Sequence, residues 1–205
     1  MERRRAIRAA VCEDHEIFRR ELLLAIEAEG LISISEEVAS LDQLDFSKTA
    51  PISVLVLDLS APVGDPITAM VHLAVERPDL SVVALAGPLD DPLPALLAGA
   101  IGVVDKATAF DDIADAIRIS TEKGAFFSRT AARAFVRVGE GVLDEGAIEL
   151  LQHRAAGRSH GEIAEFLGIE RLELGHRMLA LAGELRARRS LASLAPRVAE
   201  PASVE

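Results

Sequence analysis

The chain has 205 residues, half of them apolar, and carries a net charge of −11. This apolar content is enough for one or two folded domains and argues against a disordered chain. No apolar run reaches the roughly 18–20 residues of a membrane-spanning helix, and the basic start lacks the apolar core of a secretory signal. The single cysteine, Cys12, excludes an internal disulfide framework. We therefore expect a cytoplasmic protein without membrane contact, with Cys12 in a buried strand.

The negative charge is unevenly distributed. Residues 1–142 carry 14 Lys and Arg against 23 Asp and Glu, a balance of −9, whereas residues 143–205 carry 8 against 10, a balance of −2. Neither part has the strongly basic balance that is typical of nucleic-acid-binding domains. Charge alone thus gives no support to a DNA-binding function.

The first 125 residues alternate between apolar runs of strand length and segments with helical spacing. This alternation is typical of an α/β protein with a doubly wound parallel sheet, here of (βα)5 form. The predicted strands cover residues 7–12, 31–35, 52–57, 81–85 and 101–104, and the predicted helices cover 17–28, 38–46, 66–77, 92–98 and 110–122.

The strand pattern ends near residue 130. Residues 131–138 are mixed and lead to Gly139-Glu140-Gly141, so residues 131–142 are assigned to a linker. The domains are then 1–130, an α/β domain, and 143–195, a small all-α domain, followed by a flexible tail over 196–205. The helices predicted in the second domain cover residues 144–156, 160–167 and 172–186, with a short fourth helix over 190–194.

Acidic residues follow the predicted strands at one edge of the sheet. Asp58 ends the most apolar strand, in which five of six residues are apolar, as expected of a strand buried on both faces. Glu13 and Asp14 follow the first strand, and Asp105 and Lys106 end the fifth. In this topology strands one, three and five lie side by side, and ligands bind where the carboxyl ends of such strands meet.

Such a cluster needs a compensating cation, because neighbouring carboxylates repel each other unless one is protonated. Mg²⁺ suits a site with few carboxylates and several remaining waters. The metal would also draw a phosphoryl group onto Asp58, which could act as a nucleophile while Lys106 pairs with the phosphoryl oxygens. The alternative is that these acids are solvated loop residues. Their shared position at one edge favours the metal site.

Three segments in the first part carry a family resemblance: VCEDHEIFR at 11–19, DLSAP at 58–62 and AGAIGVVDK at 98–106. Through them, residues 7–130 resemble the receiver domain of a two-component response regulator of the NarL/FixJ subfamily. Residues 143–195 resemble the LuxR-type helix-turn-helix that follows in that subfamily. The matching residues there are Leu150, Leu151, Ala155, Ala156, Gly157, Ser159, Glu162, Ile163, Ala164 and Leu167.

The resemblance implies a role for each acidic-edge residue. Asp58 corresponds to the phospho-acceptor, and Glu13 and Asp14 to the metal-binding acid pair. The backbone carbonyl of Ser60 is a further metal ligand, and Lys106 is the phosphate-pairing lysine. The implied cofactor is Mg²⁺, and the implied partners are a sensor histidine kinase, duplex DNA and a second copy of the chain.

Two positions depart from the receiver pattern. Active receivers end the fourth strand with Thr or Ser, which bonds the phosphoryl group, whereas this chain has Ala86. The aromatic residue that rotates with that Thr would fall at Val103, which has no such rotamer switch. A methyl group cannot donate a hydrogen bond. We therefore expect an intact acid pocket that lacks the side chains through which phosphorylation changes the surrounding structure.

The predicted recognition helix also departs from its family. Members usually have Thr near its start and Lys two positions later, where this chain has Glu173 and Gly175. A carboxylate faces phosphate oxygens unfavourably unless it reads a cytosine amino group, and Gly weakens a helix by about 1 kcal/mol relative to Ala. The residues expected to contact DNA are Arg171, Glu173, His176, Arg177, Arg188 and Arg189.

Two functions remain open from these residues. The first is a DNA-binding transcriptional regulator, dimeric and only weakly dependent on phosphorylation. The alternative is a regulatory adaptor that binds a protein and has a degraded DNA-binding domain. An enzyme is not expected, since aspartate-based phosphatases need a second acid two residues after the nucleophile, where this chain has Ser60.

Overall fold

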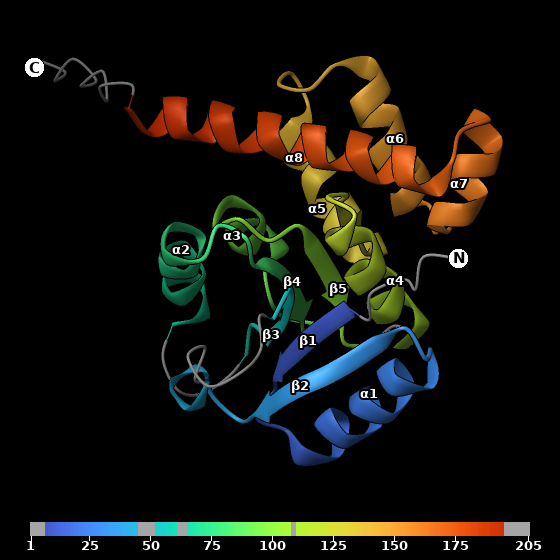
Figure 1. Cartoon of the computed structure of the whole chain (residues 1–205). Helices are drawn as coiled ribbons and strands as arrows, with labels where there is room; N and C mark the ends of the chain where they lie inside the picture. The colour runs from blue at the N-terminus through green and yellow to red at the C-terminus, as the bar shows by residue number, and fades with distance from the viewer. Residues whose placement is uncertain (1–6, 45–51, 61–64, 108–109, 195–205) are drawn as a thin grey trace, which may run out of the picture.

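The computed structural model describes residues 7–44, 52–60, 65–107 and 110–194. Its centre is a six-stranded sheet with strand order β2-β1-β3-β4-β5-β6, in which every neighbouring pair is parallel (Figure 1). The parallel sheet is thus confirmed, with a sixth short strand that the sequence pattern did not reveal. The strands are β1 (Ile7–Cys12), β2 (Ile32–Val38), β3 (Val54–Asp58), β4 (Ser81–Ala86), β5 (Gly102–Asp105) and β6 (Phe126–Phe127).

Helices cover both faces of this sheet. Alternate strand residues point to opposite faces, so Ala9 and Val11 of β1 pack with α1 and α4, whereas Ala10 and Cys12 pack with α2, α3 and α5. This is the doubly wound arrangement that the sequence predicts. The helices of this part are α1 (Glu16–Ala28), α2 (Pro66–Glu76), α3 (Pro92–Leu97), α4 (Phe110–Thr121) and α5 (Arg129–Gly139).

Two predictions for this part were wrong. No α-helix covers the described part of 38–46, because Val38 still belongs to β2 and only Leu41–Gln43 forms a 3-10 turn. The Gln43 side chain accepts a 3.1 Å hydrogen bond from the Ala39 amide, and such local bonds compete with a helix. Strands β3 and β5 also do not lie side by side as expected, because β4 lies between them. Residues 131–138, whose spacing is mixed, lie in α5, whose N-cap is Ser128.

The C-terminal helices are α6 (Glu145–Ala155), α7 (His160–Leu167) and α8 (Arg171–Leu194). Their predicted positions are confirmed, except that the two helices expected over 172–186 and 190–194 form one continuous helix. Ser159 begins α7 with a reciprocal capping box to Glu162, and Gly168 ends it in the left-handed conformation.

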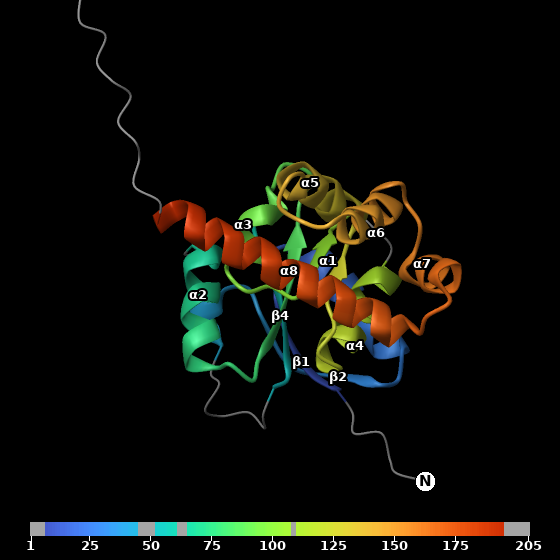
Figure 2. The same cartoon turned by 90° about the horizontal axis from the view of Figure 1, so that it is seen from above.

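The C-terminal helices lie directly on the α/β part. Leu174 and Met178 of α8 are buried in the same apolar cluster as Leu96 of α3 and Phe135 of α5. Seen from above, α8 runs across the α/β layer (Figure 2). The domain boundaries at 130 and 142 stay predictions, and the predicted tail over 196–205 lies outside the described residues. Among the described helices, none is both long and apolar enough to cross a membrane.

Candidate functional site: an acid pocket at the sheet edge

Asp58 lies fully buried at the carboxyl end of β3. Its Oδ1 accepts hydrogen bonds from the Ser60 amide at 2.9 Å and the Ser60 hydroxyl at 2.8 Å. Its Oδ2 lies 2.8 Å from Nζ of Lys106, which follows β5. The parallel order β1-β3-β4-β5 places the carboxyl ends of these strands at one edge of the sheet and thus brings together residues that are far apart in the chain.

Glu13, at the end of β1, shares the same ammonium group. Its Oε2 lies 2.8 Å from Nζ of Lys106, and its Oε1 accepts a 3.0 Å hydrogen bond from the His15 amide. Lys106 therefore bridges two fully buried carboxylates with one positive charge. The pocket is short of positive charge by about one unit, which a further cation would supply.

Asp14 completes a group of three acids. It is exposed, and one carboxylate oxygen from each of Glu13, Asp14 and Asp58 lies within 4.8 Å of the others. The Oε2 of Glu13 and the Oδ2 of Asp58 are buried and receive no hydrogen bond from the described residues besides the Lys106 contact. These oxygens are the hard ligands that Mg²⁺ prefers, so the donor set fits that ion. The Ser60 carbonyl as a ligand stays a prediction.

Burial governs the protonation of this pocket. It raises the pKa of Glu13, and Lys106 only partly opposes this effect. Burial also lowers the pKa of Lys106, but its hydrogen bonds to Asp58 and Glu13 outweigh burial and keep that pKa above its ordinary value. Cys12 lies buried in β1, as predicted, and burial together with the nearby acids raises its pKa to about 12. The thiol is therefore not a reactive group here.

Residues that sequence reasoning missed also shape the pocket. The ring of Phe18 lies 5.3 Å below Nζ of Lys106 and forms a cation–π contact. His15 is exposed, and its Nδ1 accepts the Phe18 amide as the N-cap of α1. Ser128 donates a 2.8 Å hydrogen bond to Asp105 and also caps α5, which ties the end of β5 to that helix. None of these contacts has a signal in the residue spacing.

The two positions that depart from the receiver pattern lie where the sequence places them. Ala86 ends β4 and is buried, and its carbonyl accepts the Lys106 amide at 2.9 Å. Val103 is fully buried in β5, within the core shared with α3 and α5. Neither side chain has a polar atom that could respond to a group on Asp58.

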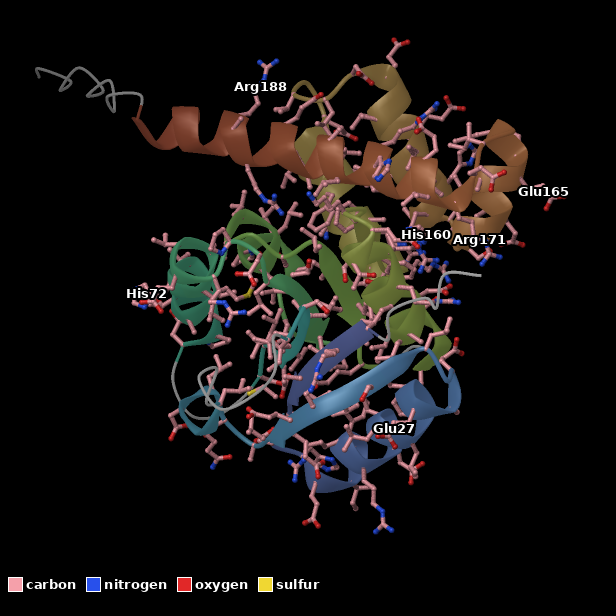
Figure 3. The ribbon with its side chains drawn as sticks, in the orientation of Figure 1. Glu27, His72, His160, Glu165, Arg171 and Arg188 are labelled. Carbon is pink, nitrogen blue, oxygen red and sulfur yellow. The ribbon has the colours of Figure 1, made fainter. Side chains whose placement is uncertain are left out.

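The residues predicted to contact DNA are mostly exposed on α8. Glu173 and Arg177 pair with each other at 3.0 Å, and Nε2 of His176 lies 3.1 Å from the Glu122 carbonyl. Arg171 and Arg188 are exposed, with Arg188 pointing away from the α/β part in Figure 3, whereas the side chain of Arg189 lies outside the described residues. Pairing within α8 thus occupies part of the charge that DNA would need.

One face of α8 is covered by the α/β part. The Ala125 amide donates a 2.8 Å hydrogen bond to the Gly175 carbonyl. Further along α8, Arg186 donates 2.7 Å hydrogen bonds to the carbonyls of Leu96 and Ala100 at the end of α3. From α6, the buried Arg154 reaches the Phe127 carbonyl at 2.7 Å and Asp112 at 3.1 Å. Polar contacts therefore fix the C-terminal helices along the whole junction.

A doubly wound parallel sheet with acids at the ends of β1 and β3 and a lysine after β5 is the arrangement of a response-regulator receiver. No family model matches the chain. It is 27% identical over 115 residues to response regulator UvrY of Escherichia coli K12, covering 55% of this chain and 53% of UvrY. The match therefore spans about half the length of that relative. Transcriptional regulatory protein LiaR of Bacillus subtilis is 27% identical over 175 residues, covering 80% of this chain and 83% of LiaR.

Solved structures show the same fold. Response regulator ChrA of a heme-sensing two-component system aligns with a TM-score of 0.57 at 23% identity, over 90% of this chain and 98% of that one. A response regulator RcsB–DNA complex aligns with a TM-score of 0.54 at 22% identity, also over 90% and 98%. The protein thus has the fold and the sequence likeness of a two-component response regulator of the NarL/FixJ type.

Proposed function

We propose that the protein is a response-regulator-like, DNA-binding transcriptional regulator whose acid pocket accepts a phosphoryl group. The observation that carries this proposal is the Lys106 ammonium, 2.8 Å from both buried carboxylates, Glu13 and Asp58. The likeness to LiaR and to the DNA-bound RcsB structure supports the DNA-binding part. By the same likeness, the proposed partners are duplex DNA, a sensor histidine kinase and a second copy of this chain.

In the proposed reaction, a carboxylate oxygen of Asp58 attacks the phosphorus of a phospho-donor, and the bond from phosphorus to the leaving group breaks. Lys106 then pairs with the phosphoryl oxygens. Glu13, Asp14 and Asp58 would hold Mg²⁺, which neutralises the charge that gathers when the phosphoryl group arrives. The side chains of Ser60 and Phe18 orient Asp58 and Lys106, respectively. Turnover as a phosphatase is not proposed, since Ser60 stands where a second acid would be needed.

The receiver is proposed to be atypical, with DNA binding that depends little on phosphorylation. Ala86 and Val103 offer no hydrogen bond and no aromatic rotamer through which a phosphoryl group on Asp58 could move its surroundings. The hydrogen bond from Ser128 to Asp105 joins the end of β5 to the start of α5. This bond supports a fixed position of α5 relative to the pocket.

The first test is the intact mass after incubation with acetyl phosphate and Mg²⁺. We expect one phosphoryl adduct on the wild type and none on Asp58→Asn. An Asp65→Asn variant serves as the control, because Asp65 caps α2 and lies outside the acid cluster. An adduct that persists in Asp58→Asn would overturn the assignment of the acceptor.

The second test separates DNA binding from its regulation. Genomic fragments retained by the wild type and by Asp58→Asn are sequenced and then measured in binding titrations at several salt concentrations. We expect both proteins to retain the same fragments with a steep salt dependence. Binding that is absent from Asp58→Asn and appears in the wild type only after phosphorylation would contradict the weak dependence.

A second candidate function is the protein-binding adaptor. It is favoured by the covered face of α8, where Leu174, Gly175 and Met178 are buried against the α/β part. If the helix never leaves this surface, it cannot enter a major groove with that face. Absence of salt-dependent duplex binding by the wild type and by a variant with a weakened junction, such as Arg186→Met, would favour the adaptor.

A further inference from the structure

A cavity of about 160 Å³ lies where α4 of the α/β part meets α7 and α8. Its polar lining comes from three helices and one adjoining residue: Asp115 and Arg118 on α4, Glu122 directly after α4, His160 on α7, and Arg171 on α8. Figure 3 shows His160 and Arg171 near each other at the start of α8. The cavity is smaller than the roughly 300–1,000 Å³ of drug-sized sites, so it suits a small ligand.

His160 is the unusual residue of this cavity. It is only 4% exposed, and neither of its ring nitrogens has a hydrogen-bond partner among the described residues. One face of the ring stacks on Phe126 at a centroid distance of 4.0 Å. Because a buried polar atom without a partner costs free energy, an imidazole held in this way calls for a further group that bonds it.

The charges around His160 decide which ligand fits. Arg154 and Arg171 both lower the pKa of His160, after burial, so the potential at the ring is positive. Arg154 is already bonded to the Phe127 carbonyl and to Asp112, whereas Arg171 has no hydrogen bond or ion pair with the described residues. The guanidinium of Arg171 lies over Gly161, where a Cβ would approach its Nη2 to 2.7 Å. Glycine at this position therefore lets the charge lie against the start of α7.

The acids of the lining do not cancel this positive charge at His160. Asp115 forms an ion pair with Arg118 on its own helix, so that pair is close to neutral. Glu122 is exposed, and its backbone carbonyl faces His176 of α8. Of the two described cations that act on the buried ring, Arg154 and Arg171, it is Arg171 that has no ion pair with the described residues, and it lies on the α7–α8 side of the cavity.

We propose that this cavity binds a small oxyanion, a phosphate or a carboxylate, between the Arg171 guanidinium and a ring N–H of His160. The anion would satisfy a buried ring nitrogen and the free guanidinium together, with charge-assisted hydrogen bonds. Because α4 belongs to the α/β part and α7 and α8 to the C-terminal part, the bound anion would stabilise the contact between the two.

The test follows the imidazole nitrogens by NMR during titration with inorganic phosphate and, separately, with acetate. Ionic strength is held constant and Mg²⁺ is omitted, so that the acid pocket does not take up phosphate. We expect a saturable shift of the His160 signals with at least one anion, and none of the His72 signals, since His72 is exposed on α2 (Figure 3). Tighter binding of phosphate or of acetate identifies the type of anion.

Two variants decide whether the named residues form the site. Arg171→Gln removes an exposed charge without touching the core, and we expect it to weaken binding at least tenfold. Arg188→Gln, further along α8 and also exposed, should leave binding unchanged. The proposal is overturned by titrations that do not saturate with either anion, or by equal affinities of the wild type and Arg171→Gln.

Discussion

The amide of Ala125 and the carbonyl of Gly175 are joined by a 2.8 Å hydrogen bond that fastens the start of α8 to the segment before β6. The approach is close because two glycines face each other there. A Cβ on Gly175 would lie 2.9 Å from Cγ2 of Ile119 and 3.3 Å from the Cα of Gly124. The helix position at which the family resemblance expects a lysine is thus used for contact with the α/β part.

Substitution of these glycines should weaken the junction. On Gly124 a Cβ would lie 3.1 Å from the Cα of Gly175, which is backbone and cannot rotate away. We expect Gly124→Ala and Gly175→Lys each to lower the free energy of unfolding by about 1–3 kcal/mol in urea titrations. The control is Gly183→Ala on the same helix, where no atom lies within 4 Å of the added methyl group. It should raise stability by up to about 1 kcal/mol, and equal losses in all three variants would contradict this account.

Removal of the shared ammonium should expose the charge shortage of the acid pocket. Lys106→Met leaves Glu13 and Asp58 buried without a positive partner, so we expect the free energy of unfolding to fall by about 3–5 kcal/mol. Saturating Mg²⁺ should recover part of this loss, because the metal can replace the missing charge. Arg20→Met, an exposed change on α1, is the control. A Lys106→Met protein as stable as the wild type without Mg²⁺ would disagree with the geometry.

The carboxyl of Glu13 should destabilise the fold at neutral pH. Burial raises its pKa above the ordinary 4.5, so the folded chain favours the protonated form. The associated stability is present below about pH 4.5 and is lost as the pH rises through the folded-state pKa. Glu13→Gln copies the protonated form at every pH. We expect it to be more stable than the wild type near neutral pH and similar in acid.

Thermal melts across this pH range would check the Glu13 prediction. Glu27→Gln provides the comparison, because Glu27 is exposed on α1, as Figure 3 shows. A stability difference between Glu13→Gln and the wild type that does not change with pH would rule out this role of burial.

His160 should make stability fall in mild acid. Burial and then Arg154 and Arg171 lower its pKa from 6.5 to about 3, so the unfolded chain binds the proton first. The stability is present above about pH 6.5 and is lost as the pH falls toward 3, by about 2 kcal/mol at pH 5. His160→Phe keeps the stack on Phe126 but has no group that binds the proton. Between about pH 6.5 and pH 5, its free energy of unfolding should therefore fall by about 2 kcal/mol less than that of the wild type. His72→Phe, a change at an exposed site on α2, is the control.

The sequence by itself predicted the parts of this protein that depend on local periodicity. The strand over 7–12 and the helix over 160–167 match the structure residue for residue, because each carries its apolar pattern and its end signals within its own segment. The meeting of Glu13, Asp58 and Lys106 was also predictable, since parallel strands place their carboxyl ends at one edge. The resemblance to a receiver domain then rested on these same three residues and the segments around them.

The tertiary structure alone decided how the two parts of the chain meet. Strand β6 is two residues long, so it depends on pairing with β5 rather than on local spacing. Helix α5 has local signals, its Ser128 cap and an apolar face with Ala131, Ala132 and Phe135, but only the tertiary structure shows that this face is buried in the core. The close approach of Gly124 to Gly175 and the unpartnered ring of His160 arise from segments more than 30 residues apart. The periodicity within a segment does not predict which distant surface will pack on it. That surface determines the burial, the hydrogen bonds and the nearby charges at each of these sites.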